Sequence, residues 1–149
     1  MDTIADDGAD RYVVLQRKGQ LFPAIFVAAA RLRRLPVWRG RDAVDPSPVF
    51  DAIEDAAMQV AFFCGEDLNA TLEQLLTAAR ALVDTVRTTQ ASSRPGFGGQ
   101  VDERFRSDDD VARRRLDHAI AAFVTAARAD LRIDSDWAPV HPADPNELG

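Results

Sequence analysis

The sequence predicts an all-α protein, an antiparallel helical bundle in which one long central helix is flanked by two shorter helices, with disordered termini. Three observations predict this fold. Apolar residues recur at helical spacing over most of the 149 residues. Stretches containing proline and glycine separate three such regions. Many of the 25 alanines fall on the apolar faces, where small side chains let helix axes approach closely. We therefore expect residues 11–132 to form one helical domain.

The first helix is expected over residues 11–34. Pro23 predicts a kink or a fresh start, because proline lacks a backbone donor and its ring crowds the preceding turn. The β-prone run Tyr12-Val13-Val14 leaves a short strand as the alternative for residues 11–18. Helix is the favoured prediction, since the chain offers no second strand to pair with it. Residues 1–10 hold four aspartates and no base, and we expect them to form a mobile acidic arm.

The long central helix is expected over residues 48–89, after a connection at 35–47. Ser47 is the expected N-cap, and Pro48 suits the first helical position. The apolar stripe spans 36 residues in ten steps of three or four, a period of 3.6 without a phase slip. The alternative is a break at Gly65, but a break usually shifts the phase, so a continuous helix is predicted. The stripe consists of Phe50, Ile53, Ala57, Ala61, Cys64, Leu68, Leu72, Leu75, Ala79, Leu82 and Val86.

A polar stretch with several glycines, residues 90–107, is expected to be a mobile loop. Ser107 is the expected cap of the third helix, because three aspartates follow it where the helix dipole favours negative charge. Residues 133–149 contain three prolines and are expected to form an extended or disordered tail, with Trp137 and Val140 pinning its first half to the body.

The unequal helix lengths bear on assembly. The third helix, at roughly 36 Å, can cover only part of a central helix of roughly 60 Å. If the first helix did not cover the rest, the apolar stripe would leave a larger exposed patch than monomers usually carry. The sequence therefore predicts a homodimer packed along residues 48–89.

The net charge of −6 hides a strong asymmetry. Residues 11–41 carry eight bases and no acid, whereas residues 1–10 sum to −4 and residues 42–149 to −10. One interpretation is an anion-binding patch for nucleic acid, phospholipid or a phosphorylated ligand. Another is pairing of the basic segment with acidic helices of the same chain, which is the simpler one, and a third is an acidic protein partner. The overall acidity argues against nucleic acid and anionic lipid. The candidate arginines are Arg31, Arg34, Arg39 and Arg41.

Few residues suggest catalysis. Cys64 lies on the apolar stripe, where burial makes a thiol inert. The histidines, His118 and His141, show no zinc-ligand spacing, and no paired carboxylate motif recurs on two helices. No cofactor or metal is therefore expected, and a metal-dependent helical enzyme ranks third among the hypotheses. The loop 94–99 lacks the residues that follow a phosphate-binding loop and is interpreted as a linker. Within it, Phe97 is a candidate docking residue.

The composition sets several classes aside. A single cysteine excludes an intrachain disulfide, the first residues lack the apolar core of a secretory signal, and the longest uncharged run is 12 residues. We therefore expect a cytoplasmic protein without a transmembrane segment. The leading hypothesis is a non-catalytic helical interaction or accessory module that self-associates. The alternative is an anion-binding module that uses residues 11–41.

Overall fold

A computed structural model of the chain describes residues 3–131, with side chains from residue 11 onward. The fold is all-α, as the sequence predicts, but it contains four long helices in place of three. The elements in order are α1 (Thr3–Arg34), β1 (Trp38–Arg39), β2 (Asp42–Ala43), α2 (Ser47–Ala61), α3 (Glu66–Ser92), the 3-10 turn η1 (Phe97–Gly99) and α4 (Glu103–Asp130). The predicted tail at 133–149 lies outside the described residues.

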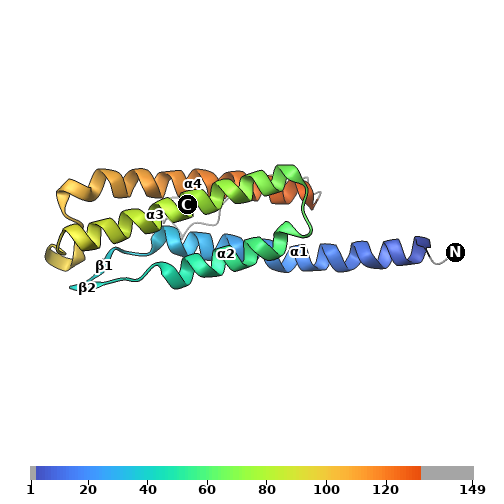
Figure 1. The fold of residues 1–149 in the computed structure, drawn as a ribbon, viewed down its shortest axis with the longest axis horizontal. Helices are drawn as coiled ribbons and strands as arrows, with labels where there is room; N and C mark the ends of the chain where they lie inside the picture. Colours follow the sequence, from blue (N-terminus) through green and yellow to red (C-terminus); the bar gives the residue numbers. More distant parts are fainter. Residues whose placement is uncertain (1–2, 132–149) are drawn as a thin grey trace, which may run out of the picture.

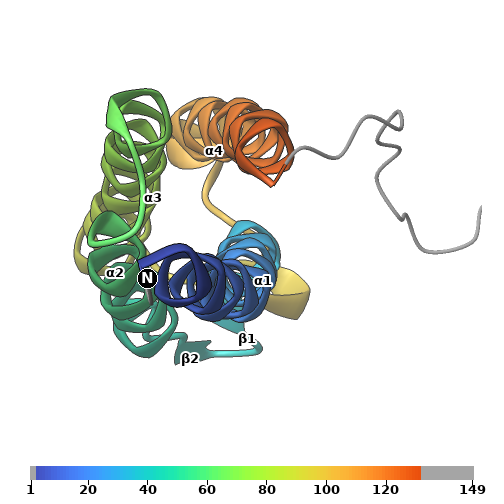
Figure 2. The ribbon, with the colours of Figure 1, turned by 90° about the vertical axis from the view of Figure 1, so that its right-hand side faces the viewer.

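The helices form an antiparallel bundle in which each helix lies beside the next one in sequence (Figure 1). Seen along its axis, the bundle closes where α4 returns to lie beside α1 (Figure 2). The pairs α1–α2 and α3–α4 make the most extensive contacts, so the bundle consists of two helical hairpins packed together. The α1–α4 contact is smaller, which leaves a groove between these two helices.

The predicted continuous helix over residues 48–89 is wrong, because residues 62–65 form a turn between α2 and α3. Gly65 is extended, with φ −78° and ψ −176°, and the Asn69 side chain donates a hydrogen bond to the Cys64 carbonyl at 3.2 Å. This turn folds the apolar stripe back on itself, so that Ile53 of α2 and Leu75 of α3 are both fully buried in one core. Eight of the eleven stripe residues are thus buried within one chain, with Phe50 and Cys64 half-buried and Ala61 exposed, so the stripe leaves no large apolar patch that a dimer would need to cover.

The first helix is longer than predicted and has no fresh start at Pro23. It begins at Thr3, so it includes most of the residues expected to form an acidic arm, and residues 11–18 are helical rather than a strand. The proline ring crowds the carbonyl four residues earlier, which belongs to Gly19, the residue type with the least restricted backbone. Lys18 is the first buried residue among the described side chains of α1, and the part before it extends beyond the other helices (Figure 1). We call residues 3–16 the α1 projection.

A short β-hairpin occupies the connection between α1 and α2. Trp38 pairs with Ala43 and Arg39 with Asp42, and Gly40 turns the chain with φ +63°. The predicted cap at Ser47 is wrong: Ser47 is the first residue of α2, and its amide donates to the Asp45 carboxylate at 3.0 Å. Asp45 thus satisfies the amide of Ser47 itself, one of the first-turn amides that have no acceptor within the helix.

The predicted loop at 90–107 is much shorter than expected. Helix α3 continues to Ser92, and α4 begins at Glu103, with Asp102 accepting a hydrogen bond from the Arg104 amide at 2.9 Å. Ser107 therefore lies inside α4 and is not its cap. Aspartate is as good an N-cap as serine, and here the earlier of the two residues starts the helix.

Large aliphatic side chains fill the centre of the bundle, and Phe22 meets Phe123 edge to face at 5.9 Å between ring centroids. Alanines lie at the seams as predicted: Ala29 and Ala79 are fully buried, and Ala57 nearly so. Small side chains at these positions let the helices approach closely. The core therefore depends on close helix contact as much as on large apolar groups.

Candidate interaction surfaces

One end of the bundle gathers three of the five predicted site residues. Arg39 and Arg41 flank Gly40 in the β1–β2 turn, and both are exposed. Phe97 begins η1, and its side chain is 96% exposed. The backbones of η1 and β1 touch at Gly99, where an added Cβ would lie 3.1 Å from the Trp38 carbonyl oxygen. We call the β1–β2 turn together with η1 the hairpin end.

The turn that carries Phe97 is held by backbone hydrogen bonds. The Gly96 amide donates to the Gln100 carbonyl at 2.8 Å, and the Gly99 amide donates to the Gly96 carbonyl at 3.1 Å. Gly98 and Gly99 have φ +67° and +81°, a region that side chains other than glycine rarely adopt. These glycines therefore specify a turn. The loop 94–99, which was expected to be a linker, holds Phe97 in a defined position.

One side chain of α3 ties the β1–β2 hairpin to the bundle, although the sequence did not identify this residue as a candidate for any role. The side-chain amide of Gln90 on α3 donates to the carbonyls of Val37 and Val44, at 2.9 and 2.7 Å. These carbonyls flank the two strands, so one side chain ties both sides of the hairpin to α3. A glutamine near the end of an amphipathic helix gives no signal of this role in the sequence.

The other two predicted residues, Arg31 and Arg34, lie on the last turns of α1 and are exposed. The Arg34 side chain donates to the Ala30 carbonyl of its own helix at 3.3 Å. The five predicted residues therefore divide into three at the hairpin end and two on α1. They do not form one described cluster.

Part of the basic segment pairs with acids of the same chain, as the simpler interpretation predicted. Lys18 lies 2.8 Å from the Asp130 carboxylate, and Arg33 lies 2.9 Å from Asp117. Both acids are on α4. Arg113 of α4 also donates to the Arg33 carbonyl at 2.7 Å. These contacts join α1 to α4 at two places along the bundle.

Groups suited to catalysis are sparse in the described part of the chain. Cys64 is half-buried, and burial raises the pKa of its thiol to about 11, even though the Lys18 ammonium acts in the opposite direction. Such a thiol carries little thiolate at neutral pH. His118 is exposed on α4. Residues 3–131 contain no cluster of three or more histidine, cysteine or acidic side chains that could hold a metal ion.

The α1 projection is a second exposed surface, at the opposite end from the hairpin end (Figure 1). Tyr12, Val13 and Leu15 are 68%, 61% and 50% exposed. Three neighbouring large apolar residues without cover are unusual for a helix that lies on a well-packed bundle. The sequence pattern identified residues 11–18 as helical but did not show that residues up to 16 would lie beyond the end of the bundle.

These surfaces are the features from which a function can be argued. No helix within residues 3–131 is long and apolar enough to cross a membrane. Comparison of the chain with protein-family models, with curated proteins and with solved structures finds no match.

Proposed function

We propose that this protein is a non-catalytic helical interaction module that self-associates through the α1 projection. The observation that carries the proposal is the exposure of Tyr12, Val13 and Leu15 on a helix that continues past the bundle. Burial of such side chains in a protein interface contributes roughly 25 cal/mol per Å² of apolar surface, before the costs of association. Tyrosine is also among the residues enriched at the centres of protein interfaces.

The charge pattern favours a second copy as the partner. Residues 1–10 carry four aspartates and no base, whereas Arg11 and Arg17 follow with no acid between them. The next base, Lys18, is already paired with Asp130 of its own chain. In an antiparallel pair related by a two-fold axis near Tyr12, the acidic stretch of each copy runs along the basic stretch of the other. A two-fold interface is self-complementary in this way, and the charges set its orientation.

Sedimentation velocity at micromolar concentrations tests the proposal. We expect the parent chain to sediment as a dimer and a Tyr12→Ser, Leu15→Ser double variant to sediment as a monomer. The matched control is Val27→Ser with Met58→Ser, because these side chains are equally exposed, at 53% and 59%, but lie outside the projection. High salt should weaken the dimer by screening the charged rim. A parent chain that remains monomeric at tens of micromolar would exclude the proposal.

A second candidate function is binding of a phosphate-bearing ligand at the hairpin end. It is favoured by the 96% exposure of Phe97 on a fixed turn beside Arg39 and Arg41. The arginine fork matches phosphate oxygens, and an exposed ring offers a face for stacking. Net repulsion from the acidic chain opposes this function, so it ranks second.

Binding at low salt tests the second candidate with three probes: single-stranded RNA, duplex DNA and vesicles containing an anionic phospholipid. We expect Arg39→Gln with Arg41→Gln to abolish binding, and Phe97→Ser to weaken binding of the RNA alone. Phe62→Ser is the matched control, because Phe62 is 89% exposed in the α2–α3 turn. Absence of binding at low salt, where electrostatic attraction is strongest, would exclude this function.

A further inference from the structure

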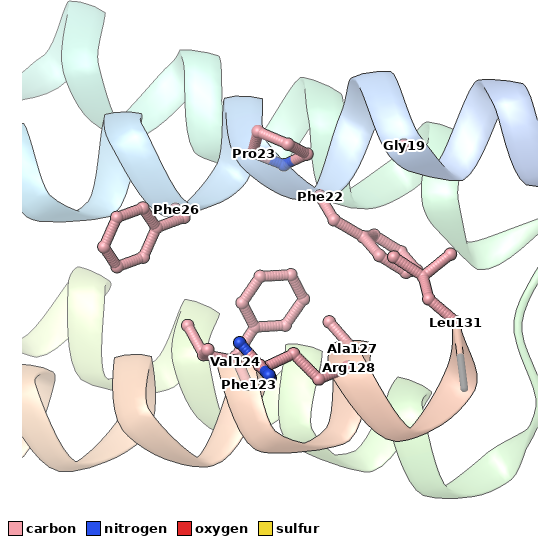
Figure 3. Close-up of a pocket in the computed structure, with 9 residues that line it drawn as sticks. All are labelled: Gly19, Phe22, Pro23, Phe26, Phe123, Val124, Ala127, Arg128 and Leu131. Atoms are coloured by element: carbon pink, nitrogen blue, oxygen red, sulfur yellow. The ribbon is translucent and has the colours of Figure 1, made fainter. Parts of the chain in front are cut away.

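A groove of about 240 Å³ runs between α1 and α4, whose contact is smaller than the contact within either helical hairpin. Phe22 and Phe26 point toward it from α1, and Phe123 points toward it from α4 (Figure 3). Eight of its nine lining residues are apolar, Arg128 being the exception. The volume lies below the roughly 300–1,000 Å³ of most small-molecule sites, and it suits one or two large side chains.

The position where the described chain ends points to an occupant. Leu131, the last described residue, itself lines the groove, and 18 residues follow it. Apolar residues recur in the next stretch at Ile133, Trp137 and Val140. Trp137 is six residues beyond Leu131 and can reach about 20 Å. The groove extends from Leu131 back to Phe123 of α4, roughly 12 Å of helix, so the chain is long enough to turn back over it.

Charge favours the same occupant. Residues 132–149 hold four acids and one arginine, whereas residues 11–34 of α1 hold six bases and no acid. The one charged residue that lines the groove, Arg128, is a base, so an acidic segment meets no like charge in the lining. Within the segment, aspartates stand between the apolar residues Ile133 and Trp137. The charges orient the segment on the groove, and burial of its apolar groups stabilises it there.

We propose that the segment 132–149 turns back over the groove between α1 and α4 and seats the Trp137 indole against Phe22 and Phe123. The segment acts as a strap that joins the end of α4 to α1, a pair whose contact is smaller than the contact within either helical hairpin. A strap in the same chain needs no partner, so its occupancy is independent of protein concentration.

Tryptophan fluorescence of the full chain tests the proposal. The chain has two tryptophans, so a Trp38→Phe variant leaves Trp137 as the single reporter. We expect its emission to be blue-shifted, and its quenching by acrylamide severalfold weaker, relative to the same chain in denaturant. Both values should stay constant on dilution. If Trp38→Phe does not fold, the difference between the parent and Trp137→Phe isolates the same signal.

Two matched variants test whether the Trp137 indole binds in the groove. Gly19 lines the groove, and a Cβ added there meets nothing within 4 Å, so Gly19→Leu adds a bulky side chain at the groove with open space at its Cβ. We expect it to raise the quenching of Trp137, whereas Ala24→Leu, at an exposed α1 position that does not line the groove, leaves it unchanged. Emission equal to that of the denatured chain would overturn the proposal. Protection lost on dilution, or unaffected by Gly19→Leu, would overturn it as well.

Discussion

Replacement of Gln90 by methionine is the sharpest test of how the hairpin end is held. Methionine keeps the length of the side chain but cannot donate, so the carbonyls of Val37 and Val44 lose the hydrogen bonds at 2.9 and 2.7 Å. At about 1 kcal/mol for each bond, the variant should lose roughly 2 kcal/mol of stability. For a chain of this size such a loss lowers the Tm by about 4–8 °C.

Thermal and urea unfolding followed by circular dichroism measure this loss, with Gln74→Met as the matched control. Gln74 lies on the same helix and is exposed, so its replacement should change stability by less than about 0.5 kcal/mol. Trp38, a buried residue of strand β1, should also shift its emission to longer wavelength in Gln90→Met alone. Equal stability losses in the two variants would refute the role assigned to Gln90.

Three further predictions follow from the described contacts. Gly98→Ala should cost about 1–2 kcal/mol, because alanine is strained at a positive φ. Gly99→Ala should cost more, because only there does the added Cβ also meet the Trp38 carbonyl, and urea unfolding of both variants measures the difference. Phe123→Ala should cost about 3–5 kcal/mol in the same assay, since the ring is 1% exposed, and a loss below 1 kcal/mol would contradict its place in the core. Alkylation of Cys64 at pH 8 should be about 100-fold slower than for a thiol of pKa 9, with a rate that still rises above pH 10, and a plateau near pH 9 would contradict the raised pKa of about 11.

The periodicity of apolar residues predicted the helical class and most of the core, because eight of the eleven stripe residues are buried in the bundle. It could not locate the α2–α3 turn. The turn at residues 62–65 is short enough to keep the stripe in phase, so a phase argument detects nothing there. The informative residues were Gly65 and Asn69, whose side chain caps the Cys64 carbonyl.

The candidate surfaces were predictable only in part. The sequence identified Arg39, Arg41 and Phe97 as candidates, because arginines without nearby acids and an aromatic residue between glycines can be recognised from the sequence alone. Their proximity could not be predicted, since it depends on a backbone contact between Gly99 and Trp38 that joins segments about 60 residues apart. The α1 projection was missed for a similar reason: where a bundle ends depends on the lengths of all its helices.

The turn between α2 and α3 also bears on how two chains can exchange parts. Because the stripe keeps its phase through residues 62–65, a straightened chain would present the same apolar face along one helix. The α3–α4 hairpin of one molecule could then fill the place of the same hairpin on another, with every core contact preserved. Domain swapping of this kind has a low energetic cost, because only the turn changes conformation. In such an exchange, protein concentration and the conformational preference of these four residues would set the balance between the closed monomer and the exchanged pair.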